Sequence, residues 1–200
     1  MVLRYVLVCA LAYFLGNIAT SYVVSKRAAN IDIRKYGSGN AGATNVLRVL
    51  GLKLGLITFV GDALKAVAAV LLGRYIAGEN GAILAGLFVV IGHNWPAVLG
   101  FKGGKGIAAT IGTVSAISPQ LVLIIIPVGI LVLAITKYVS LASIIGVTMF
   151  PILTIATGKS WQYIAFSVVL CVIALYKHRS NISRLLKGTE NKFGQKAKPE

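Results

Sequence analysis

Long apolar runs, separated by short polar or glycine-rich stretches, dominate the chain. Apolar and polar positions do not alternate within these runs, so the strands of a membrane β-barrel are not predicted. An α-helix crosses a bilayer with about 20 apolar residues, and most of the runs approach that length. The pattern predicts an all-α protein with seven transmembrane helices, at residues 2–24, 54–77, 82–94, 107–117, 119–136, 141–157 and 161–177.

Composition makes a soluble globular domain untenable. The 200 residues have a mean hydropathy of +0.84, and only 12% of them are charged, about half the ~25% that is typical of soluble domains. A chain this short has too little interior to hide so much apolar surface from water. We therefore predict a polytopic membrane protein, with a single seven-helix domain over residues 1–193 and a polar C-terminal tail over 194–200.

Two of the predicted helices, 82–94 and 107–117, are short, and the segment between them is rich in glycine. That segment is compatible with an entry into the membrane if protein or water surrounds its backbone. If 107–117 did not cross the membrane, the two termini would lie on the same side, which the distribution of charge disfavours. Seven crossings are therefore the preferred interpretation.

The positive charge is strong and unevenly distributed. The chain has twenty Lys and Arg residues and five Asp and Glu residues, which gives a net charge of +15. Most of the basic residues fall in 25–53, 95–106 and 178–200, which lie on one side if the N-terminus is outside and the C-terminus is cytoplasmic. Membrane proteins keep such segments in the cytoplasm. The charge is thus explained without nucleic acid, and no nucleic-acid partner is expected.

The first glycine-rich segment, residues 37–48, has the sequence GSGNAGATNVLR. A dinucleotide-binding loop of this pattern needs a preceding strand, whereas a membrane helix is predicted here, and a simple glycine turn that caps a helix stays an alternative. Arg48 lies four residues after Thr44, on the same face of a helix, and a guanidinium suits phosphate. Backbone N–H groups in a concave loop also bind anions. The candidate donors before Arg48 are Ser38, Gly39, Asn40 and Thr44.

The second glycine-rich segment, residues 101–110, has the sequence FKGGKGIAAT. It lacks the glycine and the hydroxyl residue that a nucleotide-binding P-loop requires. Lysines among glycines, just before the N-terminus of a helix, still suit a phosphate group. A cytoplasmic loop that merely carries positive charge is the alternative. The candidate residues are Lys102, Gly103, Gly104 and Lys105.

The third segment follows the last predicted helix. His178 and Asn181 are three residues apart and would share one helix face at the cytoplasmic boundary. A solvated helix that binds anionic lipid headgroups is the alternative. Ser140, in a short turn on the same predicted side of the membrane, is a further candidate. Asp62 and Lys65 lie within a predicted span, where charges are either functional or pair to neutralise each other. Two histidines and two distant cysteines provide no metal site.

Taken together, these segments resemble the acyl-phosphate:glycerol-3-phosphate acyltransferase (PlsY) family of bacteria. The resemblance rests on six blocks in the family's order and extends over nearly the whole chain. They are GSGNAGATNVLR at 37–48, DALK at 62–65, GHNWP at 92–96, FKGGKGIAAT at 101–110, KYVSLAS at 137–143 and HRSNISRLLKGTE at 178–190. The family often has glycine where this chain has Ala66, a difference that bears on helix packing.

The resemblance implies a multi-pass enzyme of the bacterial plasma (inner) membrane, with its active site facing the cytoplasm. We expect it to be a monomer. It would transfer a fatty acyl group from acyl phosphate to the 1-hydroxyl of glycerol 3-phosphate. The products would be lysophosphatidic acid and phosphate, in the first step of phosphatidic acid synthesis. No cofactor is expected. A transporter or channel for an anionic phosphate or lipid is the main alternative, and a non-catalytic assembly factor is a third.

The resemblance also implies roles for individual residues. Acyl phosphate is already activated, so no covalent enzyme intermediate is needed, and the donor's own phosphate is expected to accept the hydroxyl proton. His178 as general base is the competing assignment. Expected catalytic residues are Ser38, Arg48, Lys105, His178 and Asn181. Expected substrate-binding residues are Gly39, Asn40, Thr44, Lys102, Gly103, Gly104 and Ser140.

Overall fold

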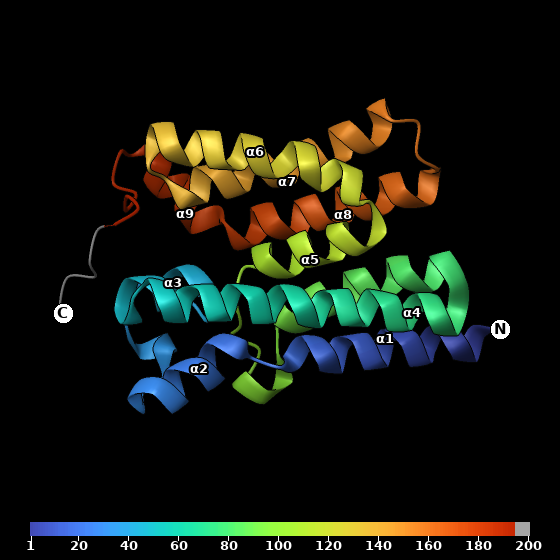
Figure 1. The fold of residues 1–200 in the computed structure, drawn as a ribbon, viewed down its shortest axis with the longest axis horizontal. Coiled ribbons are helices and arrows are strands. Elements are labelled where there is room, and N and C mark those ends of the chain that lie inside the picture. The colour runs from blue at the N-terminus through green and yellow to red at the C-terminus, as the bar shows by residue number, and fades with distance from the viewer. Residues whose placement is uncertain (195–200) are drawn as a thin grey trace. The chain divides into compact units, whose positions relative to one another are not determined.

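A computed structural model describes residues 1–194, which form α-helices, two 3₁₀ turns and no strand (Figure 1). The described residues divide into two compact units, 1–117 and 118–194. The first unit holds α1 (Val2–Asn17), α2 (Thr20–Ala29), η1 (Ile33–Lys35), α3 (Ala43–Leu50), α4 (Leu52–Asn94), η2 (Ala97–Leu99) and α5 (Ile107–Ile117). The second holds α6 (Pro119–Thr136), α7 (Val139–Ala156), α8 (Trp161–Lys177) and α9 (Arg179–Leu186).

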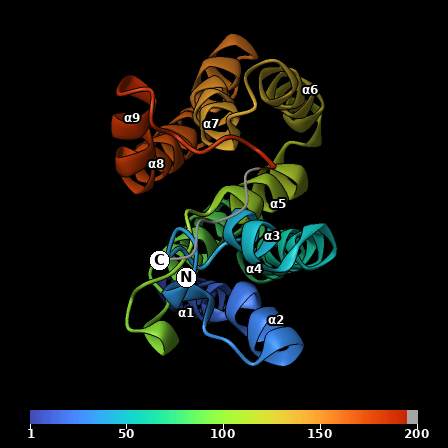
Figure 2. The same ribbon diagram turned by 90° about the vertical axis from the view of Figure 1, so that its left-hand side faces the viewer.

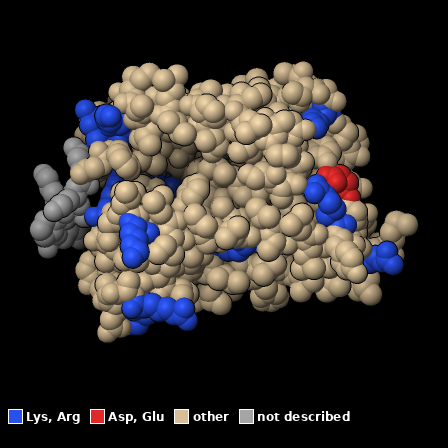
Figure 3. All heavy atoms as spheres, in the orientation of Figure 1, with Lys and Arg blue, Asp and Glu red and all other residues tan. Residues whose placement is uncertain are grey.

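The prediction of an all-α membrane protein is confirmed. Among residues 1–194, four helical segments are long and apolar enough to cross a bilayer: Val2–Ala29, Leu52–Leu99, Pro119–Thr136 and Val139–Ala156. The bent pair of α8 and α9 makes a fifth. On the face shown in Figure 3, most of the surface belongs to uncharged residues, as contact with lipid requires. The count of seven crossings and the orientation of the termini stay predictions.

In the first unit, α4 is a hairpin rather than one straight helix. Ala77 and Gly78 leave the helical conformation in its middle, and Gly78 has a φ of 66°, in the left-handed region that glycine adopts readily. The two arms correspond to the predicted helices 54–77 and 82–94. They lie against each other and against α1 and α5, a packing that Figures 1 and 2 show from two directions.

The predicted helix 2–24 is interrupted. α1 ends at Asn17, Ile18 and Ala19 are not helical, and α2 begins at Thr20. Apolar residues continue through the break, so hydropathy alone could not locate it. One side chain of α4, that of Lys65, binds the carbonyl groups of Gly16 and Ile18 at this break.

The second unit contains three helices, α6, α7 and α8, that run side by side with α7 next to both neighbours (Figure 2). Phe150 of α7 and Phe166 of α8 pack edge to face, with ring centroids 5.9 Å apart. The chain bends by 62° between α8 and α9. Of the tail predicted for 194–200, only Gly194 lies within the described residues, and the rest lies outside them.

Candidate active site

The first glycine-rich segment is held in place by Asn45, whose side chain is buried beneath it. The Asn45 amide nitrogen donates to the carbonyl groups of Ile33 and Tyr36, at 3.1 and 2.9 Å. Its Oδ1 accepts a hydrogen bond of 2.9 Å from the backbone N–H of Ser38. A buried amide with three partners gives the loop one conformation. Asn45 was part of the matching block but was not predicted as a site residue.

The backbone donors of this segment are turned inward. The N–H of Ser38 is bound by Asn45, that of Gly39 donates to a carbonyl three residues back at 3.1 Å, and that of Gly42 to Asn40 at 3.0 Å. These three groups therefore do not form the predicted anion-binding loop. The side chains of Ser38, Asn40 and Thr44 make no hydrogen bond to another residue within 1–194. It is these side chains that are available to a ligand.

Thr44 and Arg48 both lie on α3, as predicted. Gly42 precedes the helix and provides no side-chain cap. The Asn45 N–H donates to the Gly42 carbonyl at 3.0 Å, so the N–H groups of Ala43 and Thr44 are the ones that lack a capping partner. Such a helix end carries partial positive charge and favours an anion. Thr44 lies in this first turn and Arg48 in the last one. The segment therefore combines short polar donors, an open helix end and a guanidinium.

Arg34 connects the first glycine-rich segment to the turn that precedes the second one. Its guanidinium donates to both carboxylate oxygens of Asp32, with the shortest contact 2.7 Å, and to the carbonyl of Leu99 at 2.9 Å. These hydrogen bonds from Arg34 hold the pKa of Asp32 below its ordinary value. Sequence analysis did not single out Arg34, because its partner at 99 is distant along the chain.

The second glycine-rich segment packs tightly against His93, near the C-terminal end of α4. The Gly104 N–H donates to the carbonyl of His93 at 3.1 Å. A Cβ on Gly104 would collide with His93 Nε2 and would lie 2.9 Å from the carbonyl oxygen of Ala41. Glycine is required here because the backbone comes so close to its neighbours. Since Ala41 belongs to the first segment, the two glycine-rich segments are adjacent.

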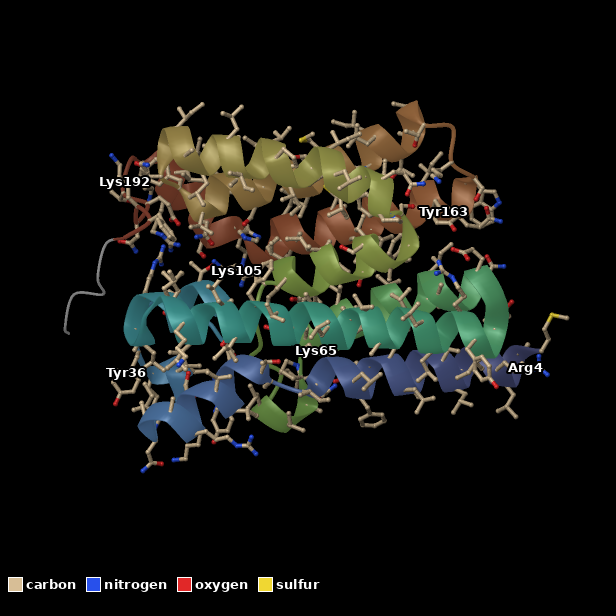
Figure 4. All side chains as sticks on the ribbon, viewed as in Figure 1. Arg4, Tyr36, Lys65, Lys105, Tyr163 and Lys192 are labelled. Carbon is tan, nitrogen blue, oxygen red and sulfur yellow. The ribbon has the colours of Figure 1, made fainter. Side chains whose placement is uncertain are left out.

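Lysines flank this tightly packed pair of glycines. Gly103 and Gly104 are buried, Lys102 is exposed and Lys105 is half-buried. Figure 4 shows Lys105 on the loop that leads into α5. Packing against His93 accounts for the glycine at 104. The predicted substrate-binding role of Gly103 and Gly104 stays a prediction.

Asp62 and Lys65 form an ion pair, one of the two alternatives left open by the sequence, and His93 joins it. Lys65 Nζ lies 2.8 Å from Asp62 Oδ1 and 3.2 Å from His93 Nδ1, and all three side chains are buried. The same ammonium donates to the carbonyl groups of Gly16 at 3.0 Å and Ile18 at 2.6 Å. These are carbonyl groups at the break between α1 and α2, so Lys65 stabilises the interruption (Figure 4).

In the second unit, a carboxylate that sequence analysis missed organises the predicted residues. Glu190, whose side chain is 2% exposed, accepts hydrogen bonds from Ser140 Oγ at 2.9 Å and from the Asn181 amide at 2.8 Å through Oε1. Its Oε2 accepts from Arg184 at 2.7 Å. Burial acts to raise the pKa of Glu190, but the three hydrogen bonds outweigh it and place the pKa below the ordinary 4.5. A single acidic residue within the basic stretch 177–194 was the available sequence signal.

His178 lies at the bend between α8 and α9. It is buried, and its Nδ1 lies 2.8 Å from the carbonyl oxygen of Ala174. A carbonyl can only accept, so Nδ1 of His178 carries a proton. Asn181 lies one turn later in α9. His178 and Asn181 were predicted to share one face of a single helix. In the structure His178 lies between α8 and α9, immediately before the first residue of α9, and Asn181 lies within α9.

The predicted site residues fall into two groups. Those of the two glycine-rich segments lie in the first unit, where Ala41 and Gly104 bring the segments together. His178, Asn181 and Ser140 lie in the second unit, where Glu190 connects the last two. Within residues 1–194, no group of three or more His, Cys, Asp or Glu side chains is arranged to hold a metal ion.

Sequence comparison identifies the protein family. A family model described as glycerol-3-phosphate acyltransferase matches residues 6–188. The chain belongs to the glycerol-3-phosphate acyltransferase family. A relative from Thermoanaerobacter sp. (strain X514), named glycerol-3-phosphate acyltransferase, is 53% identical over 191 residues, which are 96% of each chain. Another of that name, from Clostridioides difficile (strain 630), is 50% identical over 201 residues, 98% of each chain.

Solved structures of the glycerol-3-phosphate acyltransferase family have the same fold. The crystal structure of PlsY (YgiH), an integral membrane glycerol 3-phosphate acyltransferase in its glycerol 3-phosphate form, aligns with a TM-score of 0.90 and 37% identity, over 95% of this chain and 96% of that one. The lysophosphatidic acid form aligns with a TM-score of 0.88 and 36% identity, over 95% of each chain. The predicted family, and the predicted class of membrane acyltransferase in phospholipid synthesis, are confirmed.

Proposed function

We propose that this member of the glycerol-3-phosphate acyltransferase family takes its acyl group from a fatty acyl phosphate. It transfers that group to the 1-hydroxyl of glycerol 3-phosphate and releases lysophosphatidic acid and phosphate. The acceptor and the product correspond to the two ligand forms described for PlsY. The observation that carries the choice of donor is the paired glycine-rich segments, which offer cationic and polar groups suited to phosphate.

The phosphate groups are assigned to the first unit. Ser38, Asn40 and Thr44 present side chains without a protein partner within 1–194, and Arg48 follows them on the same short helix. Lys105 and, less directly, Lys102 contribute positive charge from the adjacent loop. Both substrates are phosphorylated anions, so neutralising their mutual repulsion is the main task of these groups. Gly39, Gly103 and Gly104 shape the loops on which the charged groups stand.

Glycerol 3-phosphate is oriented by His178 and Asn181, with Ser140 as a further contact. The hydrogen bond from His178 Nδ1 to the Ala174 carbonyl fixes the ring, and we assign the substrate hydroxyl to the opposite nitrogen, Nε2. Glu190 holds the Asn181 amide and the Ser140 hydroxyl. The donor's phosphate accepts the hydroxyl proton, and positioning supplies much of the rate. No covalent intermediate and no cofactor take part.

The membrane topology follows the helices and the charge. The two arms of α4, together with α1, α5, α6, α7 and α8, make seven crossings. The N-terminus is then outside, and the basic segments 25–53, 95–106 and 178–200 are cytoplasmic. We infer that the enzyme works as a monomer in the bacterial inner membrane, with its active site on the cytoplasmic side. Labelling of single cysteines introduced near each terminus with a membrane-impermeant reagent tests the orientation.

Purified protein is expected to release inorganic phosphate from a fatty acyl phosphate only when glycerol 3-phosphate is present. Acyl-CoA, as the control donor, is expected to produce no lysophosphatidic acid, because it lacks the acyl-phosphate group. Phosphate release and lipid product are measured on the same sample. Formation of lysophosphatidic acid from acyl-CoA and glycerol 3-phosphate, but not from acyl phosphate, would contradict the assignment of the donor. Phosphate movement across sealed vesicles without any acyl transfer would favour the transporter alternative.

Replacing His178 by alanine is expected to raise KM for glycerol 3-phosphate more than it lowers kcat, because the ring orients the acceptor and does not take its proton. The dependence of kcat on pH is expected to keep the form it has in the unmodified enzyme. The measurement is a set of initial-rate curves for both proteins between pH 5 and 9. A limb in the pH profile of kcat reports the ionisation of an essential acid or base in the enzyme–substrate complex. Loss of one limb of the pH profile, with unchanged KM, would instead make His178 the general base.

A further inference from the structure

The buried cluster of Asp62, Lys65 and His93 has no assigned part in the reaction. It lies inside the first unit, in the two arms of α4. The Lys65 ammonium donates to the carbonyl oxygens of Gly16 and Ile18, forms an ion pair with Asp62 Oδ1 and lies 3.2 Å from His93 Nδ1. A charged cluster at this depth is costly and is expected to serve a purpose.

One side of the cluster stabilises the break in the first membrane segment. Carbonyl groups at a helix end lack partners in their own helix, and unpaired backbone groups in a membrane are strongly unfavourable. Lys65 donates to two of them. Asn17, at the same break, accepts a hydrogen bond of 2.5 Å from the Ala97 N–H through Oδ1. The break is therefore attached both to α4 and to the turn that leads into the second glycine-rich segment.

The other side of the cluster reaches that segment through His93. His93 Nδ1 lies 3.2 Å from Lys65 Nζ and 3.4 Å from Asp62 Oδ1, so this edge of the ring contacts both partners of the ion pair. Nε2 faces the backbone of Gly104, at a point that also lies next to the carbonyl of Ala41. The His93 carbonyl accepts the Gly104 N–H. One imidazole thus connects Lys65 to the place where both glycine-rich segments meet, one residue before Lys105.

We propose that Asp62, Lys65 and His93 are positioning residues, which set the loop that carries Lys105 by anchoring Gly104 to the broken first membrane segment. Asp62 and the two backbone carbonyls hold the ammonium of Lys65. Lys65 in turn holds the His93 ring, and the ring supports the loop. The inference rests on the proposed role of Lys105 in phosphate binding, but the order of the loop can be measured without any substrate.

The variants are chosen to separate loop positioning from general stability. His93→Gln removes the ring and leaves the contacts of Lys65 with Asp62, Gly16 and Ile18 in place. Lys65→Met removes the ammonium at the centre of the cluster and keeps a side chain of similar length. Lys53→Met is the matched control, because Lys53 is an exposed lysine at the start of the same helix. All variants are purified in detergent as full-length protein, and their melting temperatures are recorded.

Hydrogen–deuterium exchange provides the first measurement. In substrate-free protein, His93→Gln is expected to speed amide exchange over residues 101–106 while exchange in α1 stays as it was. Lys65→Met is expected to speed exchange both there and at residues 16–20, and Lys53→Met to change neither. Unchanged exchange over 101–106 in His93→Gln would overturn the proposal. Because the exchange is measured without substrate, its result does not depend on whether the protein uses acyl phosphate.

Kinetic coupling provides the second measurement. His93→Gln is expected to lower kcat/KM by about 10-fold to 100-fold, as small displacements of a distant support do. In a Lys105→Ala background the same change is expected to cost less than about 3-fold, because residues that act through one another are not additive. Additive effects, or near-normal kinetics in His93→Gln, would overturn the proposal. If the proposed phosphate-binding role of Lys105 is wrong, Lys105→Ala will have normal kinetics. Faster amide exchange over residues 101–106 in His93→Gln would then still support the positioning role of His93.

Discussion

Replacing either Arg48 or Lys105 by alanine is expected to lower kcat/KM by on the order of 100-fold or more. Each substitution would remove a charge-assisted contact to a phosphate group, worth ~3 kcal/mol in the transition state. The neighbouring donors cannot compensate, since Ser38, Asn40 and Thr44 carry no charge. Initial rates with acyl phosphate and glycerol 3-phosphate measure the effect.

Two comparisons sharpen this test. Lys53→Ala removes an exposed lysine from the same unit and is expected to leave kcat/KM unchanged, which excludes a general effect of net charge. Arg48→Lys keeps the charge but loses the planar guanidinium, so it is expected to recover only part of the activity. Near-normal kinetics in both Arg48→Ala and Lys105→Ala would refute the proposed phosphate site.

Replacing Glu190 by alanine is expected to destabilise the second unit by about 1–3 kcal/mol, the cost of leaving buried polar groups without their acceptor. Ser140, Asn181 and Arg184 would all lose their common acceptor. Activity is expected to fall with stability, because the Asn181 amide would no longer be held. Thermal unfolding in detergent and kcat/KM are measured together. The control is Glu79→Gln, where a more exposed ion pair with Arg74 is worth no more than ~1 kcal/mol.

The same residue predicts a dependence of stability on pH. The pKa of Glu190 in the folded protein lies below its ordinary value of 4.5, so the folded state binds this proton less readily than the unfolded state. Ionised Glu190 therefore stabilises the fold above about pH 4.5, and this contribution disappears as the pH falls through the lower, folded pKa. Glu190→Gln is expected to lose that part of the acid dependence. If the unmodified protein and Glu190→Gln unfolded at the same acidic pH, the proposed stabilisation by ionised Glu190 would be contradicted.

Hydropathy located most of the helices correctly because their ends coincide with residues that interrupt apolar runs. The helices at 107–117, 119–136 and 161–177 begin and end where they were predicted. Gly106, Pro119 and Lys177 mark some of these limits. Local sequence was sufficient, since a helix in a membrane satisfies its own backbone and needs no distant partner to form.

Local sequence failed where a contact from far along the chain decides the backbone. The first predicted helix is broken at Ile18 and Ala19 because Lys65, 47 residues away, binds the Ile18 carbonyl. In the first glycine-rich segment the deciding contacts are nearer, two to seven residues along the chain, but the sequence pattern did not reveal them either. Asn45 and the loop's own carbonyls occupy the N–H groups of Ser38, Gly39 and Gly42, and so the side chains are left to face a ligand.

The sequence by itself determined that the protein is an all-α membrane protein, where most of its helices lie, and to which family it belongs. Each of these depends on composition or on short blocks of neighbouring residues. Only the tertiary structure decided why Gly104 must be glycine, what breaks the first membrane segment, and that Glu190 holds Ser140 and Asn181 together. These features depend on single hydrogen bonds or close contacts between residues that are about ten to sixty positions apart, and a pattern along one chain does not contain such pairings.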